Sequence, residues 1–554
     1  MTGRKTLAIA LAAAAVGFGG WTLAAQGAAY DVLIRGAQVV DGTGNPYFYG
    51  DVAVKNGRIA GVGHLAGAAA TRIIDAKGLV VAPGFIDMHT HSDMAVVADG
   101  TAQSKIRQGV TLDVIGEGSS VAPRDGLKAE GDQDWTTLTG YFQKLEKAGV
   151  SMNIASYVSE GQVRRVVMGY DTGPASPAQL ERMKQLVART MEEGAVGLMG
   201  RFESGGPEHP DEVIELAKVA ARYPGSHYAS HIGSEGYEQQ KELDFALRVA
   251  REVNIPVHVL HFKIRGEKLW PKMPEYVRQV QAVRDSGFDV TANVYPYGAM
   301  SHGWSSIVPL WVREGGPEKY AERLRDKSLR PRIKADPDFI AWMEEHGGWE
   351  GVVMARARTP KNSEYEGMSV AAIAKARGDA DPADTFLDLM ADDGGGISGV
   401  FHNQSEENVK LVLSQPWVSP ASDGSAINLQ AAGVPHPRNY GTNVRVLGKY
   451  VREEHLLTLE DAVRKMTSLP AQVLGLRDRG QLREGFAADI VVFDPKTVGD
   501  TNTYEKPKSY ARGVPYVLVN GVLVIDKGEH TGARPGRAIL GPGYKAARAA
   551  TSGQ

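Results

Sequence analysis

The chain contains no cysteine among its 554 residues. This absence excludes disulfides, iron–sulfur clusters, thiolate zinc sites and cysteine nucleophiles, so any metal must be held by His, Asp or Glu. An excess of one charge is also missing, because 62 Lys and Arg oppose 65 Asp and Glu and give a formal charge of −3. The chain therefore lacks the basic footprint that nucleic acids and anionic membranes recognise.

Long apolar runs are scarce outside the N-terminus. Arg4 and Lys5 precede an apolar run from Leu7 to Phe18, and small residues follow, which is the layout of a secretory signal peptide over residues 1–28. The run is too short for a comfortable membrane anchor. We expect an exported protein, periplasmic in a bacterium, with no stable membrane anchor after cleavage. An uncleaved anchor and a disordered leader are the alternatives.

The rest of the composition is that of a globular protein of two to four domains, with 43% hydrophobic and 23% charged residues. Residues 29–81 read as short alternating strands separated by Gly and Asn-Gly turns, and residues 477–545 repeat this texture. We expect the two ends to pair into one small β-sandwich, followed by a flexible tail at 546–554. Two separate edge hairpins are the less stable alternative.

The middle of the chain, residues 82–476, alternates short apolar runs with amphipathic helical stretches such as residues 176–194. Eight of the apolar runs end in polar or glycine residues. This pattern predicts an α/β fold, a (β/α)8 TIM-like barrel, whose site lies at the carboxyl ends of the strands. The longest interruption, residues 298–399 after the seventh strand, exceeds a connecting loop and predicts a small lid or subdomain.

Histidines gather at the expected strand ends. The first strand ends in His89 and His91, which period-2 alternation points to one face, and the pair alone also fits two ordinary half-buried histidines. The fifth strand ends at His231, the sixth carries His261, and the eighth is followed by Asp423. Four imidazoles and one acid at the tips of barrel strands predict a shared cation site.

Such a set of side chains has the chemistry of a hydrolytic metal centre. Neutral imidazoles suit Zn²⁺ and similar divalent ions, and an incomplete ligand set leaves room for a water molecule whose pKa falls toward neutrality. A nearby carboxylate can remove the proton and later pass it to the leaving group. We therefore interpret Asp423 as a general base and acid that also serves as a metal ligand.

Several motifs resemble a known family. The segment PGFIDMHTH, the strand-five histidine, the strand-six HxK and the strand-eight SDG resemble the amidohydrolase superfamily. Over nearly the whole mature length the chain is similar to the D-aminoacylase (N-acyl-D-amino-acid deacylase) family. The narrower resemblance rests on GVTLDVIGEGSSVAP, GAVGLMGRFE, YASHIGSEG, PVHVLHFK, DVTANVYPY, PWVSPASDG and HPRNYGTNVRVLGKYVRE.

The resemblance implies a metal-dependent hydrolase that cleaves N-acyl D-amino acids to a carboxylic acid and a free amino acid by metal-activated hydroxide. It implies one or two divalent ions, zinc in the first place. His89 and His91 would hold one metal position, His231 and His261 the other, and Asp423 would lie between water and substrate.

The same resemblance implies three residues that bind the substrate carboxylate. They are Lys263, two residues beyond His261 and expected on the same strand face, Tyr295, and Arg438, whose guanidinium can grip a carboxylate through two hydrogen bonds. Spacing alone equally fits a rim lysine in solvent, a tyrosine used for packing and an arginine on a surface loop.

The chain departs from the family at the second strand. Where relatives carry Gly-Asn-Cys-Gly, this chain reads Gly116-Glu117-Gly118. We expect Glu117 to replace the thiolate as a ligand, and the two oxygens of a carboxylate would allow it to bridge two ions. A strand-end acid that caps a helix is the alternative, and Glu203 is a less favoured substitute for the ligand.

Two further departures concern the substrate. Gly233 stands where the family often has arginine, and Asn293 occupies a position that is often acidic, so the preference for simple D-amino acids need not transfer. The expected partner is a small anionic amide, and a homo-oligomer is open. On the same scaffold a cyclic amide hydrolase, similar to dihydroorotase or hydantoinase, and a dipeptidase are alternatives; a non-catalytic binding protein is less favoured.

Overall fold

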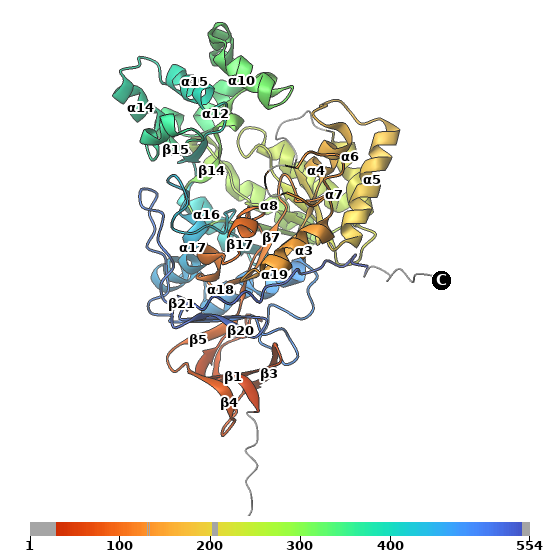
Figure 1. Ribbon diagram of the computed structural model, residues 1–554, viewed down its shortest axis with the longest axis vertical. Helices are drawn as coiled ribbons and strands as arrows, with labels where there is room; N and C mark the ends of the chain where they lie inside the picture. The colour runs from red at the N-terminus through yellow and green to blue at the C-terminus, as the bar shows by residue number, and fades with distance from the viewer. Residues whose placement is uncertain (1–28, 130, 132, 202–208, 546–554) are drawn as a thin grey trace, which may run out of the picture.

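The computed structural model describes residues 29–129, 131, 133–201 and 209–545 (Figure 1). The expected signal peptide, the expected tail at 546–554 and Glu203 lie outside the described residues. None of the helices within the described ranges has the length and apolar character needed to cross a membrane.

The centre of the molecule is built from parallel strands that follow one another around a ring. Neighbours along the chain pair in parallel on both sides of the short gap between β8 and β9. The ring closes where Thr90 bridges Gly424 and the Asp423 amide donates to the His89 carbonyl over 2.8 Å. This arrangement agrees with the predicted barrel. The ring strands are β6 (Phe85–Asp87), β7 (Val110–Ile115), β8 (Asn153–Ser156), β9 (Val158–Ser159), β10 (Gly197–Arg201), β11 (His227–His231), β12 (Val257–Val259), β13 (Val290–Val294) and β17 (Val418–Pro420).

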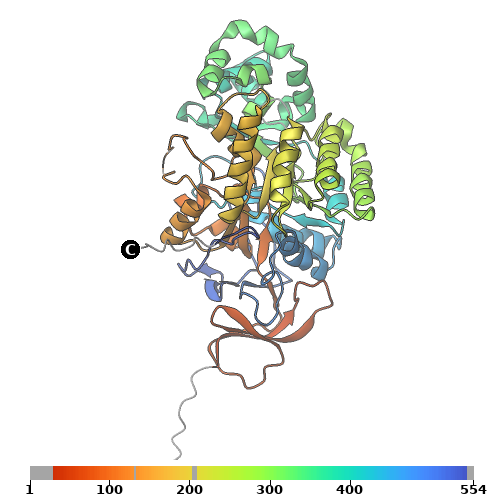
Figure 2. The same cartoon turned by 90° about the vertical axis from the view of Figure 1, so that its right-hand side faces the viewer.

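Amphipathic helices cover the outside of the ring. Helix α5 packs beside α6, α6 beside α7 and α7 beside α8, and Figure 2 shows this row of helices from the outside. Their local sequence explains their limits: α5 begins with a capping box in which the Ser176 and Gln179 side chains satisfy each other's backbone amides. The helices of the barrel region are α1 (Ala95–Ala98), α2 (Gln103–Ile106), α3 (Leu138–Ala148), α4 (Glu160–Met168), α5 (Pro177–Glu192), α6 (Pro210–Ala220), α7 (Gln239–Val253), α8 (Met273–Asp285), α16 (Glu406–Leu413), α17 (Arg438–Arg445), α18 (Leu459–Met466) and α19 (Ser468–Val473).

The two β-rich ends of the chain share one sheet below the barrel (Figure 1). Strand β5 pairs antiparallel with β18, so the alternative of two separate hairpins is wrong. Ile490 and Val492 of β18 face an apolar core shared with the N-terminal strands, whereas Val491 and Phe493 face the barrel core. The strands are β1 (Tyr30–Val39), β2 (Phe48–Lys55), β3 (Arg58–Gly63), β4 (Ala70–Asp75), β5 (Val80–Pro83), β18 (Ile490–Phe493), β19 (Tyr516–Val519), β20 (Val522–Asp526) and β21 (Glu529–His530).

The long segment after β13 forms an α/β unit that sits above the barrel in Figure 1 and has its own apolar core. Its strands pair antiparallel in the order β14, β16, β15. We call this segment, residues 300–401, the insertion. Its elements are β14 (Met300–Gly303), α9 (Leu310–Arg313), α10 (Pro317–Arg325), α11 (Arg330–Lys334), α12 (Pro337–Glu345), α13 (Gly348–Gly351), β15 (Val352–Arg356), α14 (Val370–Arg377), α15 (Pro382–Asp392) and β16 (Ser398–Phe401).

Candidate metal centre

The segments that follow β6, β7, β12 and β17 bring three of the histidines together with Glu117 and Asp423. One ligand atom each of His89, His261 and Asp423 lies within 4.8 Å of the others, and the same holds for His89, His91 and Glu117. The two groups share His89, so they form one continuous cluster. The carboxyl ends of neighbouring parallel strands meet at the same edge of the ring, which is why residues far apart in the sequence converge here.

Glu117 faces two different imidazoles. Its Oε2 lies 3.2 Å from Nε2 of His91, and its Oε1 lies 3.4 Å from Nε2 of His231. The side chain follows β7 and stands between Gly116 and Gly118, whose φ angles of +97° and +72° turn the chain sharply at this point. The two oxygens of Glu117 therefore face two different histidines.

Asp423 is held between a histidine and an arginine. Its Oδ1 lies 2.9 Å from Nε2 of His91, and its Oδ2 accepts a hydrogen bond from Arg438 over 2.8 Å. Burial opposes ionisation, but the Arg438 guanidinium outweighs it and holds the pKa of Asp423 well below its ordinary value. The residue has a φ of +49°, in the left-handed region that side chains rarely adopt, as strained residues at functional sites often do.

The ring nitrogens of His89 indicate that these residues fit a cation. Both of its ring nitrogens are buried and make no hydrogen bond to any described residue. Burial lowers the pKa of His89 to about 3, so the ring is neutral and keeps a lone pair. Buried polar atoms are almost always paired, and neutral imidazole is a preferred zinc ligand, so the site fits a divalent ion.

The surroundings of His91 also stabilise a positive charge. Although loss of solvent opposes its protonation, Glu117 and Asp423 raise the pKa of His91 to about 9. Two carboxylates that crowd one imidazole stabilise a positive charge between them, and either a proton or a metal cation supplies it. The surroundings of His91 are therefore those of a cation site.

His261 lies beyond its strand. The expectation that His261 and Lys263 share a strand face is wrong, because β12 ends at Val259 and His261 has a φ of +34°. Asn293, noted only as a departure from the family, explains this conformation: its side-chain oxygen accepts the His261 amide over 2.6 Å and its carbonyl accepts the Phe262 amide over 2.7 Å.

The three expected carboxylate-binding residues converge beside the cluster. The Arg438 guanidinium lies 4.8 Å and the Lys263 ammonium 5.1 Å from the ring centre of Tyr295. The Tyr295 hydroxyl accepts a hydrogen bond from Gln404 over 2.6 Å. All three side chains are buried, so neither Lys263 nor Arg438 is the solvent-exposed residue that spacing alone allowed.

Glu235 is the contact that sequence reasoning missed. Its Oε1 lies 2.7 Å from Nδ1 of His261 and also contacts the ammonium of Lys263. Burial opposes its ionisation, but Lys263 and His261 outweigh burial and keep the pKa of Glu235 well below its ordinary value. The signal was present in the motif YASHIGSEG, but spacing does not show which strand a loop glutamate will contact.

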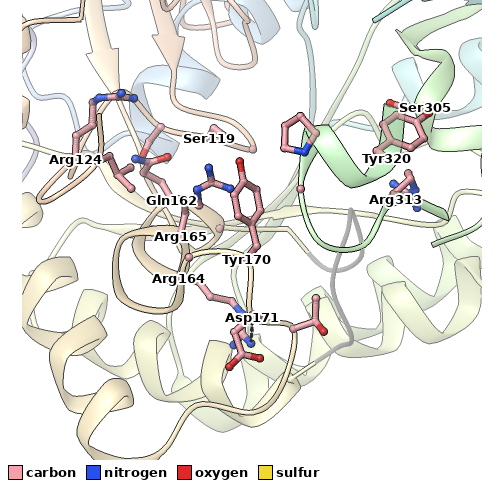
Figure 3. Close-up of a pocket in the computed structure, with 18 of the residues that line it drawn as sticks. Ser119, Arg124, Gln162, Arg164, Arg165, Tyr170, Asp171, Ser305, Arg313 and Tyr320 are labelled. Carbon is pink, nitrogen blue, oxygen red and sulfur yellow. Dashed lines mark hydrogen bonds between the residues drawn. The ribbon is translucent and has the colours of Figure 1, made fainter. Parts of the chain in front are cut away.

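A cleft of about 1240 Å³ adjoins the cluster. It begins at Asp93 and Gly118, next to His91 and Glu117, and its far wall belongs to the insertion. Figure 3 shows Arg165 and Tyr170 on the barrel side, with Arg313, Tyr320 and Ser305 on the insertion side. The Arg165 guanidinium stacks 3.4 Å from the ring centre of Tyr170. The cleft thus lies between the barrel rim and the insertion, and its lining includes neither the side chains of the ligand cluster nor Lys263, Tyr295 and Arg438.

Comparison with known proteins assigns the chain to a family. Residues 72–525 match the Amidohydrolase family. The chain belongs to this family. The N-acyl-D-glutamate deacylase of Alcaligenes xylosoxydans xylosoxydans is 34% identical, and the match covers 92% of this chain and 96% of the relative. The D-aminoacylase of the same organism is 31% identical, over 92% of this chain and 97% of the relative.

Solved structures agree with this assignment. The N-acyl-D-glutamate deacylase of Bordetella bronchiseptica, complexed with zinc and a phosphonate mimic of the tetrahedral intermediate, matches with a TM-score of 0.78 and 29% identity over 92% of this chain and 99% of that chain. A D-aminoacylase structure matches with a TM-score of 0.77 and 30% identity over 92% of this chain and all of that chain. The resemblance inferred from the motifs is confirmed, and the fold is the α/β amidohydrolase fold.

Proposed function

We propose that this amidohydrolase cleaves the amide bond of N-acyl D-amino acids and releases a carboxylic acid and a free amino acid. The observation that carries the proposal is Asp423, an ionised acid fixed between the His91 imidazole and the Arg438 guanidinium at the edge of the histidine cluster. The deacylases that share the fold and about 30% of the sequence support the reaction class.

The cluster supplies nitrogen and carboxylate ligands in a set that suits one or two divalent ions, zinc above all. When bound by these residues, a divalent ion would supply Lewis acidity that polarises a carbonyl and lowers the pKa of a water molecule. We propose that Glu117 would contribute to both metal positions, because its two oxygens face different histidines. The residues that would hold the ions are His89, His91, Glu117, His231, His261 and Asp423.

The remaining steps belong to the chain's own side chains. Asp423 takes the proton of the attacking water and returns it to the leaving nitrogen, as a general base and then a general acid. Lys263, Tyr295 and Arg438 bind the carboxylate of the amino acid, and the planar guanidinium of Arg438 fixes its orientation. Binding in a fixed orientation raises the rate, because the substrate has already lost its translational and rotational freedom before it reaches the transition state.

We further propose that the region predicted as a lid, residues 298–399, closes over the bound substrate. Its residues that line the cleft opposite the barrel rim include Ser305, Arg313 and Tyr320, which supports this role. Closure would exclude water from the reacting groups. The strands of the two chain ends, interpreted as a small sandwich, contribute no residue to the proposed ligand set.

We also propose that residues 1–28 direct export to the periplasm. The charged start, short apolar run and small residues of this segment support the proposal. Expression of the full chain in a Gram-negative host, fractionation and N-terminal sequencing would test it. The expected periplasmic product begins near residue 29, and a full-length cytoplasmic product would contradict export.

A chelation experiment tests the hydrolase. Purified protein is stripped of metal by a chelator and assayed on a panel of N-acyl D- and L-amino acids, before and after addition of Zn²⁺ or Mn²⁺. We expect chelation to abolish hydrolysis and metal to restore it, with D substrates preferred. Asp423→Asn should remain at least about a hundredfold slower after metal addition, since the proton-transfer group is lost.

Equal turnover in stripped and loaded samples would overturn the proposal. Hydantoins, dihydroorotate and dipeptides belong in the same panel, because a dihydroorotase is 25% identical over 84% of this chain and 90% of the relative. Faster turnover of one of these compounds than of every N-acyl amino acid would favour the corresponding alternative.

A further inference from the structure

Glu235 connects two parts of the site that the proposed reaction uses separately. One oxygen, Oε1, lies 2.7 Å from Nδ1 of His261 and contacts Nζ of Lys263. The side chain is 3% exposed, so its electrostatic interaction with its neighbours is stronger than it would be in water. It follows β11 by four residues and so comes from a different strand than the two side chains it contacts.

We propose that Glu235 is a positioning residue that fixes His261 for metal binding and Lys263 for recognition of the substrate carboxylate. The second half of this inference rests on the proposed function, since it assigns Lys263 a substrate contact. The first half does not, because it concerns only a cation and an imidazole.

The argument for His261 is one of tautomer and orientation. Oε1 of Glu235 lies 2.7 Å from Nδ1 of His261 without the alignment of a hydrogen bond. A carboxylate so close to one ring nitrogen favours the proton on that nitrogen, which leaves the lone pair of Nε2 for a metal ion. The ring of His261 lies 4.9 Å from that of His89 and 4.5 Å from that of His231, centre to centre. In so crowded a group, rotation of one ring would misdirect its lone pair, and Glu235 opposes that rotation.

The argument for Lys263 is one of charge. Lys263 and Arg438 are both buried cations beside the ring of Tyr295. Asp423 compensates Arg438, and Glu235 compensates Lys263. Without Glu235 the lysine would be a buried, unpaired charge, which proteins avoid by moving or neutralising the group. Glu235 thus keeps a charged lysine in place for an arriving carboxylate.

Glu235 is itself held by the insertion. Its carbonyl accepts the Arg265 amide over 2.8 Å, and the Arg265 guanidinium pairs with Oε2 of Glu345, at the end of α12, over 2.6 Å. The other oxygen of Glu345 accepts the Tyr237 amide over 2.8 Å. The segment that carries Glu235 is therefore tied on both sides to one buried glutamate of the insertion.

The decisive variant is Glu235→Gln, which keeps the size of the side chain and an acceptor oxygen but removes the charge. Metal-free protein is titrated with Zn²⁺ against a competing chromophoric chelator, a measurement that needs no substrate. We expect the zinc affinity to fall about 10- to 100-fold, the usual cost of losing a group that orients a metal-bound histidine. Glu238→Gln, an exposed neighbour in the same loop, is the matched control and should bind zinc as the wild type does.

A second measurement separates positioning from general damage. At saturating zinc, Glu235→Gln should raise KM for an N-acetyl D-amino acid about tenfold, while turnover of the matching N-acetyl alkylamine, which has no carboxylate, changes far less relative to the wild type. Glu235→Asp restores the charge and should recover part of the zinc affinity. Circular dichroism and the thermal midpoint establish that each variant is folded.

Zinc affinity within twofold of the wild type in folded Glu235→Gln would overturn the role at His261. An equal loss on both substrates would overturn the role at Lys263. If Glu235→Gln does not fold, Glu345→Gln, which weakens the support of the Glu235 segment, carries the same two measurements. If the wild type hydrolyses neither substrate, the proposed function fails, and the zinc titration still decides the role at His261.

Discussion

Glu117 is the residue in which this chain differs most from the family pattern. A thiolate offers one donor atom, whereas the carboxylate of Glu117 directs one oxygen toward His91 and the other toward His231. Carboxylate oxygen is also a harder ligand than thiolate sulfur, so the substitution favours a wider range of divalent ions. Glu117 is thus the residue that we propose as a ligand in the place of the thiolate.

We predict that Glu117→Ala lowers both the bound zinc and the rate of hydrolysis by more than about tenfold, because one carboxylate links the two halves of the cluster. Elemental analysis of the purified variant measures the metal, and hydrolysis at saturating zinc measures the rate. Asp171→Ala, at an acid in the wall of the cleft, is the control and should retain its metal. Unchanged metal in Glu117→Ala would show that this residue is not a ligand.

For single residues, patterns in the sequence predict the metal ligands but not the residues that orient those ligands. His89 and His91 stand two apart at the end of one strand, and this spacing is visible in any reading of the chain. Glu235 and Asn293 reach His261 from two other strands, and no spacing in the sequence contains that information.

Among the elements, the seam between β6 and β17 is stabilised by a buried ion pair. Lys105, from α2, lies 2.8 Å from Oδ2 of Asp87 and also contacts the hydroxyl of Ser422. The other oxygen of Asp87 accepts the Ser422 amide over 2.9 Å. Asp87 and Ser422 directly precede the segments that carry His89 and Asp423, so the pair holds both ends of the ring in register at the site.

We predict that Lys105→Met destabilises the protein by about 3–5 kcal/mol, because it leaves Asp87 as a buried, unpaired charge. The thermal midpoint should fall clearly and activity should fall with it. Lys361→Met is the matched control, since Lys361 pairs with Asp392 at the surface, where such a pair is worth about 1 kcal/mol or less. Similar midpoints for the two variants would contradict the role of the seam.

The elements themselves follow well from the sequence where periodicity is strong. The amphipathic pattern of residues 176–194 predicts a helix, and the structure contains α5 there. The end of β12 is different, because the left-handed turn at His261 depends on the side chain of Asn293 in the next strand. Local pattern predicts an element, and tertiary contacts decide where it stops.

For the whole molecule, buried histidines make stability depend on pH. His227 lies inside the barrel, where its Nε2 is 3.1 Å from the Tyr157 hydroxyl, and burial lowers its pKa from 6.5 to about 4. Below pH 6.5 the unfolded chain binds a proton that the native protein does not. The contribution of this residue is therefore complete above pH 6.5 and is lost progressively as the pH falls toward 4.

We predict that His227→Gln, which cannot titrate, loses less stability on acidification than the wild type. At pH 5 the difference attributable to this residue is about 2 kcal/mol, from the linkage between proton binding and unfolding. Thermal midpoints at pH 7.5 and pH 5 measure it. An equal fall in both proteins would show that His227 is not part of the acid sensitivity.

The sequence by itself determined the order of the strands and helices, the histidine and acid at the strand ends, and the family, because these depend on periodicity and on short motifs. Only the tertiary structure decided that Glu117 faces two imidazoles, that Lys263 and Arg438 are buried, and that Glu235 joins His261 to Lys263. These contacts join strands that are distant in the chain, and their geometry exists only once the ring has closed.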